Sequence, residues 1–198
     1  MHVGEIMEKR FILDEKYYSY GYKPKLLLHV CCAPCSSSVM ECLSDYFDIT
    51  VLFYNPNIYP YEEYIKRKNE VVGYLNNMSI NFIDCDYESE IYEKTVCGYE
   101  NEIEGGLRCN KCIRLRLEKT FEYAKDFDYV CSTLSVSPHK NSKMINEIGL
   151  LLEKKYSVNY LVNDFKKNDG YKRSIELSKI NNFYRQNYCG CKYSIREE

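Results

Sequence analysis

Apolar residues follow two alternating patterns along the chain, short compact runs and longer stretches with helical spacing. The runs are rich in β-branched and aromatic residues and predict five strands, at 25–30, 48–55, 80–87, 128–134 and 159–164. Between them, residues 36–43, 61–78, 112–127 and 141–156 carry apolar side chains on one helical face. This alternation predicts an α/β fold, a parallel sheet of about five strands with flanking helices on both faces.

The remaining segments are more polar. The charged stretch that ends at Gly106 predicts a loop or short helices, and residues 171–195 predict a helix followed by a loop. The first 24 residues precede the first strand and match none of the patterns described below. We therefore expect an N-terminal extension, residues 1–24, and a single α/β domain, residues 25–198.

Polar and sulfur-bearing residues follow each predicted strand. The carboxyl ends of parallel strands meet at one edge of a sheet, and functional sites lie beyond that edge. We therefore expect these residues to lie on one rim: Cys31, Cys32 and Cys35 after the first strand, Asn55 after the second, Asp84 and Asp86 after the third, 135–139 after the fourth, and Asp164 after the fifth.

Cysteine is the unusual feature of the composition, with 11 residues in a chain of 198. The chain begins with a charged and aromatic segment that does not look like a secretory leader, and no apolar run is long enough to cross a bilayer. We therefore expect a cytoplasmic protein without membrane contact. In that reducing compartment, many cysteines indicate metal binding, redox chemistry or both.

Two cysteine groups have the spacing of metal ligands. Cys31, Cys32 and Cys35 lie within five residues, and Cys109 and Cys112 form a CxxC motif ahead of a predicted helix. A helix N-terminus favours thiolates, which both metal binding and redox chemistry need. Spacing alone leaves three interpretations open: a [4Fe–4S] cluster, a structural zinc site, or a redox dithiol.

The last two cysteines, Cys189 and Cys191, enclose a single glycine. A disulfide across one residue closes a small strained ring, which makes it a labile two-electron couple. The motif therefore suits a redox relay better than a structural crosslink. The four remaining cysteines, Cys42, Cys85, Cys97 and Cys131, stand alone in the sequence, and we assign them no chemistry.

Six motifs follow one another between residues 25 and 194. They are HVCCAPC (29–35), FYNPNIYPYEEYIKR (53–67), LRCNKCIRLRL (107–117), STLSVSPHKN (132–141), NDFKKNDGYKRS (163–174) and FYRQNYCGCKYS (183–194). Together they resemble the cobalamin-independent epoxyqueuosine reductases. The resemblance implies reduction of epoxyqueuosine to queuosine at the wobble position of tRNA, and a fold like the adenine-nucleotide α-hydrolase (HUP-like) group without ATP dependence.

The resemblance also implies roles for individual residues. Cys31, Cys32, Cys109 and Cys112 match the [4Fe–4S] ligands of the family, and Cys189 and Cys191 match its redox-active disulfide. We further expect Cys35 to lie beside the cluster, where it could hold a mononuclear iron. Removal of an epoxide oxygen requires proton donors. The candidates are Asp164, His139 and, more remotely, Asp14.

A tRNA substrate requires local positive charge, because the net charge is only -2. Basic residues gather in the C-terminal third, and another group surrounds the CxxC motif. They are Lys166, Lys167, Lys172, Arg173 and Arg185, with Arg108, Lys111, Arg114 and Arg116 near the CxxC. The electron donor is not identified. Two rival functions stay open: a zinc-stabilised tRNA-binding module, and a thiol or iron–sulfur electron-transfer protein.

Overall fold

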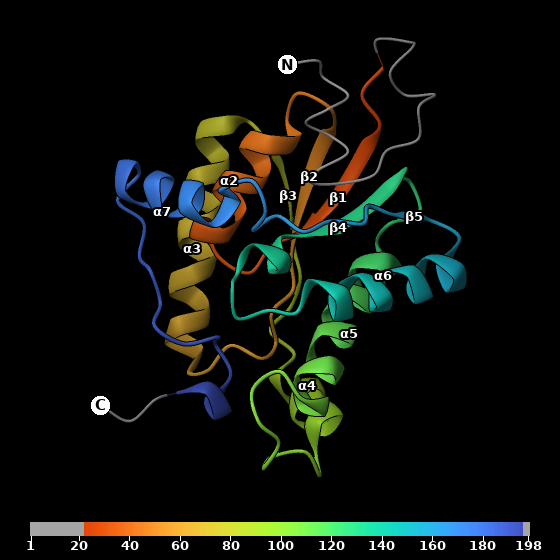
Figure 1. Ribbon diagram of the computed structural model, residues 1–198, viewed down its shortest axis with the longest axis vertical. Helices are drawn as coiled ribbons and strands as arrows, with labels where there is room; N and C mark the ends of the chain where they lie inside the picture. The colour runs from red at the N-terminus through yellow and green to blue at the C-terminus, as the bar shows by residue number, and fades with distance from the viewer. Residues whose placement is uncertain (1–21, 196–198) are drawn as a thin grey trace.

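Five parallel strands form one sheet in this computed structural model, which describes residues 22–195 (Figure 1). The strand order is β3-β2-β1-β4-β5, so the first strand is central. The predicted α/β fold is confirmed. The strands are β1 (Lys25–His29), β2 (Asp48–Phe53), β3 (Asn81–Asp84), β4 (Tyr129–Ser132) and β5 (Asn159–Tyr160).

Helices cover both faces of this sheet. On one face lie α2 (Ala33–Leu43), α3 (Tyr61–Met78) and α7 (Gly170–Ile180), and α7 packs against α2. On the other lie α5 (Leu107–Glu122) and α6 (Ser142–Tyr156), which pack against each other. Figure 1 shows the two layers, with α2, α3 and α7 on one side and α5 and α6 on the other. A further helix, α4 (Ser89–Val96), lies in the charged stretch and packs against α5.

The central strand shows why the sheet needs both layers. Successive side chains of a strand point to opposite faces, so Leu26 and Leu28 enter the core beneath α2 and α3, and Leu27 enters the core beneath α5 and α6. All three are completely buried. Each buried leucine contributes about 1.5–3 kcal/mol. The uniformly apolar sequence of β1 is therefore typical of a strand covered on both faces.

Several predicted boundaries are wrong, among them the following three. Helix α5 begins at Leu107 rather than at residue 112. Its first turn is held because the Glu102 carboxylate accepts a hydrogen bond from the Leu107 amide, and because the Arg108 side chain donates to carbonyls of the preceding loop. Strand β4 ends at Ser132. The Ser132 hydroxyl accepts a hydrogen bond from the Leu134 amide, and this starts a 3-10 turn (Thr133–Val136). Strand β5 is only two residues long.

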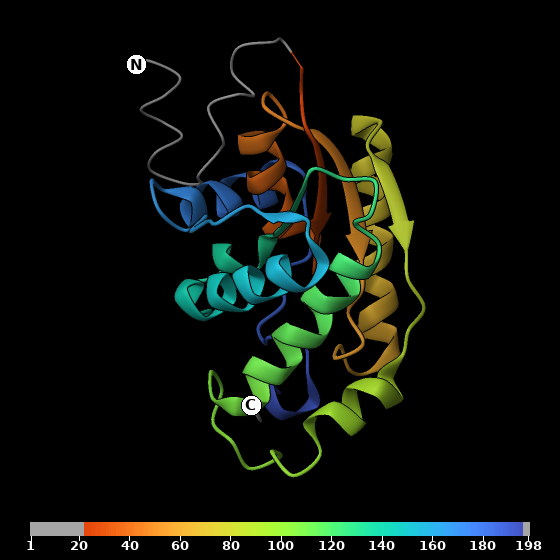
Figure 2. The same cartoon turned by 90° about the vertical axis from the view of Figure 1, so that its right-hand side faces the viewer.

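All five strands run in the same direction. In Figure 2 the arrowheads of β2 and β3 point toward the end of the molecule where α4, the first turns of α5 and the C-terminal tail (residues 181–195) gather, and the other strands are parallel to them. The tail ends in a 3-10 turn (Lys192–Ser194). None of the helices in residues 22–195 combines the length and the apolar character of a bilayer-spanning helix. The predicted N-terminal extension lies almost wholly outside the described residues.

Candidate functional site

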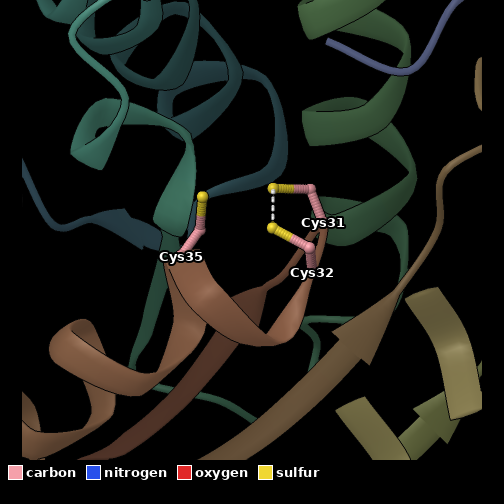
Figure 3. A group of neighbouring side chains, drawn as sticks. All are labelled: Cys31, Cys32 and Cys35. Atoms are coloured by element: carbon pink, nitrogen blue, oxygen red, sulfur yellow. Dashed lines mark hydrogen bonds between the residues drawn. The ribbon is translucent and has the colours of Figure 1, made fainter. Parts of the chain in front are cut away.

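The first feature of the site is a cysteine trio, Cys31, Cys32 and Cys35, at the carboxyl end of β1. Their three sulfur atoms lie within 4.8 Å of one another, the arrangement that a metal centre requires. Figure 3 shows the sulfur atoms of Cys31 and Cys32 facing each other, 3.8 Å apart, with Cys35 beside them on the first turn of α2. Pro34, in that same turn, has a ring that presets the helical backbone angle.

The three thiols of the trio differ in the direction in which their pKa values shift. Hydrogen bonds from Cys32 and Cys35 lower the pKa of Cys31 well below its usual range. The same interaction with Cys31 raises the pKa of Cys32 to about 12, and it raises that of Cys35 too. The thiols alone therefore favour one thiolate over three. A metal cation would change this balance, because it deprotonates the thiols that coordinate it.

A polar layer beneath the trio fixes the strand ends. His29 is completely buried, with Nδ1 3.0 Å from the Ser132 hydroxyl and Nε2 3.1 Å from the Tyr54 carbonyl. Burial and the charge of Arg116 lower its pKa to about 3, so the imidazole is neutral. Its Nε2–H can then donate to the carbonyl, and Nδ1 can accept from Ser132. Asn55 donates to the Val30 carbonyl at 2.9 Å and links β2 to the cysteine loop.

A cavity of about 290 Å³ opens beside the trio, and Cys31, Cys35 and Cys189 are among the residues that line it. Cationic side chains also line it, among them Arg67 of α3, Arg116 of α5, and Lys140 from the loop before α6. The two arginines are only 1% and 2% exposed. Buried cations are costly unless they are paired. The cavity wall therefore has a positive potential that suits thiolates and anionic or polar ligands.

Arg67 joins α3 to the C-terminal tail. Its Nε pairs with Glu63 at 2.7 Å, its Nη1 donates to the Cys189 carbonyl at 3.2 Å, and its guanidinium lies over the Tyr188 ring. Gly190 allows this approach. Its φ of +129° lies in the region that favours glycine, and a side chain there would come within 3.0 Å of Arg67 Nη1.

A second, smaller hollow adjoins the cavity and contains the other sequence-predicted cysteines. Cys109 and Cys112 of α5 line it together with Cys189 and Cys191 of the tail. Burial raises the pKa of Cys112 to about 12. Among residues 22–195, only the Cys31 trio meets the 4.8 Å spacing, so the predicted ligands Cys109 and Cys112 lie in the neighbouring hollow rather than within the trio.

The two tail cysteines have different surroundings. Lys140 donates to Cys189 Sγ at 2.7 Å; burial lowers the pKa of Lys140, but its interaction with this sulfur outweighs that effect and raises the pKa. Cys191 is buried in a small apolar cluster with Tyr92, Val96 and Cys112. No disulfide joins any of the eleven cysteines, all of which lie within residues 22–195. The couple predicted between Cys189 and Cys191 stays a prediction.

The predicted proton donors fall in different places. His139 is exposed and lines the cavity. Asp164 forms an ion pair with Lys166 at 2.7 Å. Among the described residues it lines neither the cavity nor the smaller hollow. Asp14 lies outside the described residues. Position therefore favours His139 over Asp164 for contact with a bound molecule.

The predicted basic cluster is partly neutralised by its own neighbours. Arg173 pairs with Glu41 and Glu176, and Lys166 pairs with Asp164. Lys167, Lys172 and Arg185 are exposed, and Arg185 lines the cavity. Near the CxxC, Arg108 and Arg116 are buried and bind polar groups of the protein, which removes them from the predicted tRNA surface. Lys111 is half-buried and Arg114 is exposed.

Sequence reasoning missed Arg67, Lys140 and Gln186 as parts of the site. Arg67 had a usable signal, because it is the one charged residue among the buried positions of α3, the others being Tyr64, Val71 and Leu75. A charge on the apolar stripe of a helix implies a buried partner. Lys140 and Gln186 lie in loops, where periodicity gives no such signal.

Comparison with known proteins relates the chain to a family of reductases. Residues 26–197 match the family model described as Epoxyqueuosine reductase QueH. A protein of that name from Streptococcus pyogenes is 43% identical over 88% of this chain and 71% of its own length, and one from Staphylococcus epidermidis is 43% identical over 90% and 79%. The solved structure of U34-tRNA thiolase NcsA from Methanococcus maripaludis with its [4Fe-4S] cluster has a similar fold. Its TM-score is 0.56 at 13% identity, and the likeness covers 91% of this chain and 65% of that one.

The contact between Lys140 and Cys189 generates a first prediction. An adjacent ammonium group favours the reactive thiolate. Replacing Lys140 with methionine should therefore slow alkylation of Cys189 by iodoacetamide roughly three- to tenfold near neutral pH. Peptide mass spectrometry of the reduced protein measures this rate against the exposed Cys97. Lys143→Met is the matched control, since the Lys143 side chain is 85% exposed. Equal Cys189 rates in the Lys140 variant and wild type would contradict the assignment.

Proposed function

The chain belongs to the epoxyqueuosine reductase QueH family, an oxidoreductase family, and on that premise we propose that it reduces the epoxide of epoxyqueuosine at the wobble position of tRNA to give queuosine. The observation that carries the proposal is the placement of seven thiols around a cationic cavity and its adjoining hollow. Such a concentration of sulfur next to a ligand-sized space suits reduction of a bound group.

The reaction itself sets the requirements. Conversion of an epoxide to an alkene consumes two electrons and two protons and releases the oxygen as water. Oxidation of two thiols to a disulfide supplies two electrons and two protons. We infer that Cys189 and Cys191 form this couple, and that an external reductant of low potential restores the dithiol after each turnover. The position of Cys189 on the cavity wall supports this role.

The donor set fits an iron–sulfur cofactor. The trio offers sulfur ligands only, within 4.8 Å, and buried cations nearby can balance the negative charge of a cluster. We propose that Cys31 and Cys32, with Cys109 and Cys112, hold a [4Fe–4S] cluster, and that Cys35 holds an adjacent iron. When bound, these metals supply electron transfer and Lewis acidity toward the epoxide oxygen.

The chain's own groups bind and orient the substrate. Arg67 and Arg116 present guanidinium groups to the cavity, where they can hold polar groups without reorganising. His139 and Lys140 lie on the same wall and can donate protons to the leaving oxygen. Asp164, committed to its ion pair with Lys166, is the weaker candidate.

The size of the cavity supports a nucleotide that is turned out of its stack. A volume of about 290 Å³ accommodates a modified base but not a folded RNA stem. Single-stranded loops are recognised by aromatic stacking and by contacts to phosphates. Arg185 lines the cavity, and Tyr59 and Tyr61 are exposed near the tail, where the Tyr188 hydroxyl binds the Tyr59 carbonyl. We propose that Arg185, Tyr59 and Tyr61, together with Lys167 and Lys172, form the surface that binds the anticodon loop.

The central experiment combines metal analysis with turnover. Anaerobically purified protein should be brown, contain about four or more irons per chain, and convert epoxyqueuosine-containing tRNA with a low-potential reductant, read out by nucleoside analysis. Cys31→Ser and Cys112→Ser should lose most of the iron, whereas the exposed Cys97→Ser should retain it. Colourless protein with one zinc per chain would favour the tRNA-binding module. Iron-loaded protein without conversion would favour an electron-transfer role.

The tail couple has a separate test. A Cys189→Ser/Cys191→Ser double variant should keep the iron content and visible spectrum of wild type but stop after at most one turnover, because the two-electron reservoir is missing. Product per enzyme in a burst experiment measures this. A Cys42→Ser variant serves as the control, since Cys42 lies on α2 outside the cavity lining. Sustained multiple turnover by the double variant would show that electrons bypass the tail.

The proposed RNA surface predicts a change in salt dependence. Lys167→Ala/Lys172→Ala should weaken tRNA binding and reduce the slope of log affinity against log salt by about 0.7–0.9 for each phosphate that the variant no longer binds. Filter binding between low and moderate salt measures both effects. The matched control is Lys143→Ala/Lys154→Ala, which removes two exposed lysines of α6. Equal slopes for the two double variants would place the RNA elsewhere.

A further inference from the structure

Gln186 reaches in two directions from the C-terminal tail. Its Nε2 donates a hydrogen bond to Cys32 Sγ at 3.1 Å, and its side chain lines the cavity. The other end of the amide, Oε1, is buried and has no hydrogen-bond partner among the described residues. A buried acceptor without a partner is costly, so this oxygen points to a ligand that supplies a donor.

Three further side chains of the same cavity have unpaired polar atoms. Asn57 Oδ1 is a buried acceptor, Arg67 Nη2 and Arg116 Nε are buried donors, and none of the three has a partner in residues 22–195. Together with Gln186 Oε1 they offer two acceptors and two donors. A ligand that satisfies this set carries several hydroxyl groups, because each hydroxyl both donates and accepts. The ring of epoxyqueuosine, a cyclopentane with two hydroxyls and an epoxide, has this chemistry.

We propose that Gln186 is a positioning and specificity residue that recognises the hydroxylated ring of the substrate and at the same time holds the sulfur of Cys32. Its Oε1 accepts a hydrogen bond from a ring hydroxyl, and its Nε2 keeps its bond to Cys32 Sγ. This inference rests on the proposed function. It adds a physical link, one amide group, between occupancy of the cavity and the sulfur of a proposed cluster ligand.

The link has a redox consequence. Hydrogen bonds to cysteine sulfur help to set the reduction potential of an iron–sulfur cluster, because they stabilise the more negative reduced state. Loss of the Gln186 donor therefore lowers the potential. A bound hydroxyl polarises the amide through Oε1 and strengthens the N–H···S bond at its other end. Ring binding therefore raises the potential of the cluster that is to reduce the substrate.

Two variants separate the two ends of the amide. Gln186→Met removes both the acceptor and the donor at similar length. Gln186→Glu keeps the acceptor but replaces the donor to Cys32. Asn69→Ala, which removes an exposed amide on α3, is the control.

Each iron-loaded protein is tested for binding of two tRNAs. One carries queuosine, the product, and the other carries 7-aminomethyl-7-deazaguanine, which lacks the ring. Anaerobic spectroelectrochemistry gives the potential with and without the queuosine tRNA.

Wild type and Asn69→Ala should prefer the ring-bearing tRNA and raise their potential when it binds. Gln186→Met should lose about five- to a hundredfold of that preference. Gln186→Glu should retain the preference, and both Gln186 variants should have a lower potential that no longer responds to the ring. An unchanged preference in Gln186→Met overturns the inference. If that variant fails to fold or load iron, a wild-type potential in Gln186→Glu overturns it. Failure of the proposed function is distinct, since wild type itself would then not convert epoxyqueuosine tRNA.

Discussion

Positive charge buried among sulfur atoms is the constraint on which this site depends. Removing an ion from water costs several kcal/mol, and the cost is offset only by close partners. Arg67 pairs with Glu63 and donates a hydrogen bond to the Cys189 carbonyl. Arg116 donates to the Asn55 side chain at 2.5 Å, and Lys140 donates to the Cys189 sulfur. Each cation is thereby fixed at the cavity wall. Lys140 is held by a sulfur atom, whereas the two arginines are held by oxygen atoms.

The sheet supplies the geometry for that arrangement. Because all five strands are parallel and β1 is central, the cysteine loop emerges at the middle of the rim, with β2 and β4 on either side. Side chains at the ends of these strands, among them His29, Asn55 and Ser132, bond to one another or to neighbouring backbone and leave few movable groups beneath the trio. The trio therefore lies on a rigid support, and the tail covers it from the other side.

Periodicity identified most of the fold, since strands covered on both faces are continuously apolar and helices carry one apolar stripe. It failed where side chains bond locally, as at Ser132, which ends β4, and at Glu102, which starts α5 early. The closeness of Cys31, Cys32 and Cys35 could be expected from their local spacing. The site was not predicted where residues meet across the chain, as Arg67 and Cys189 do over 122 positions, because one sequence carries no trace of such pairings.

The contacts of the C-terminal tail set the order in which the molecule can be completed. The Gly190 carbonyl accepts a hydrogen bond from the Tyr59 amide at 2.8 Å, and the Glu70 carboxylate of α3 accepts one from the Tyr184 amide at 2.6 Å. The ribosome makes this tail after every strand of the sheet. A nascent or truncated chain can therefore form its sheet while the cysteine trio stays uncovered. Sulfur chemistry at this site is thus enclosed only after residues 184–190 have been made and have bound Tyr59 and Glu70.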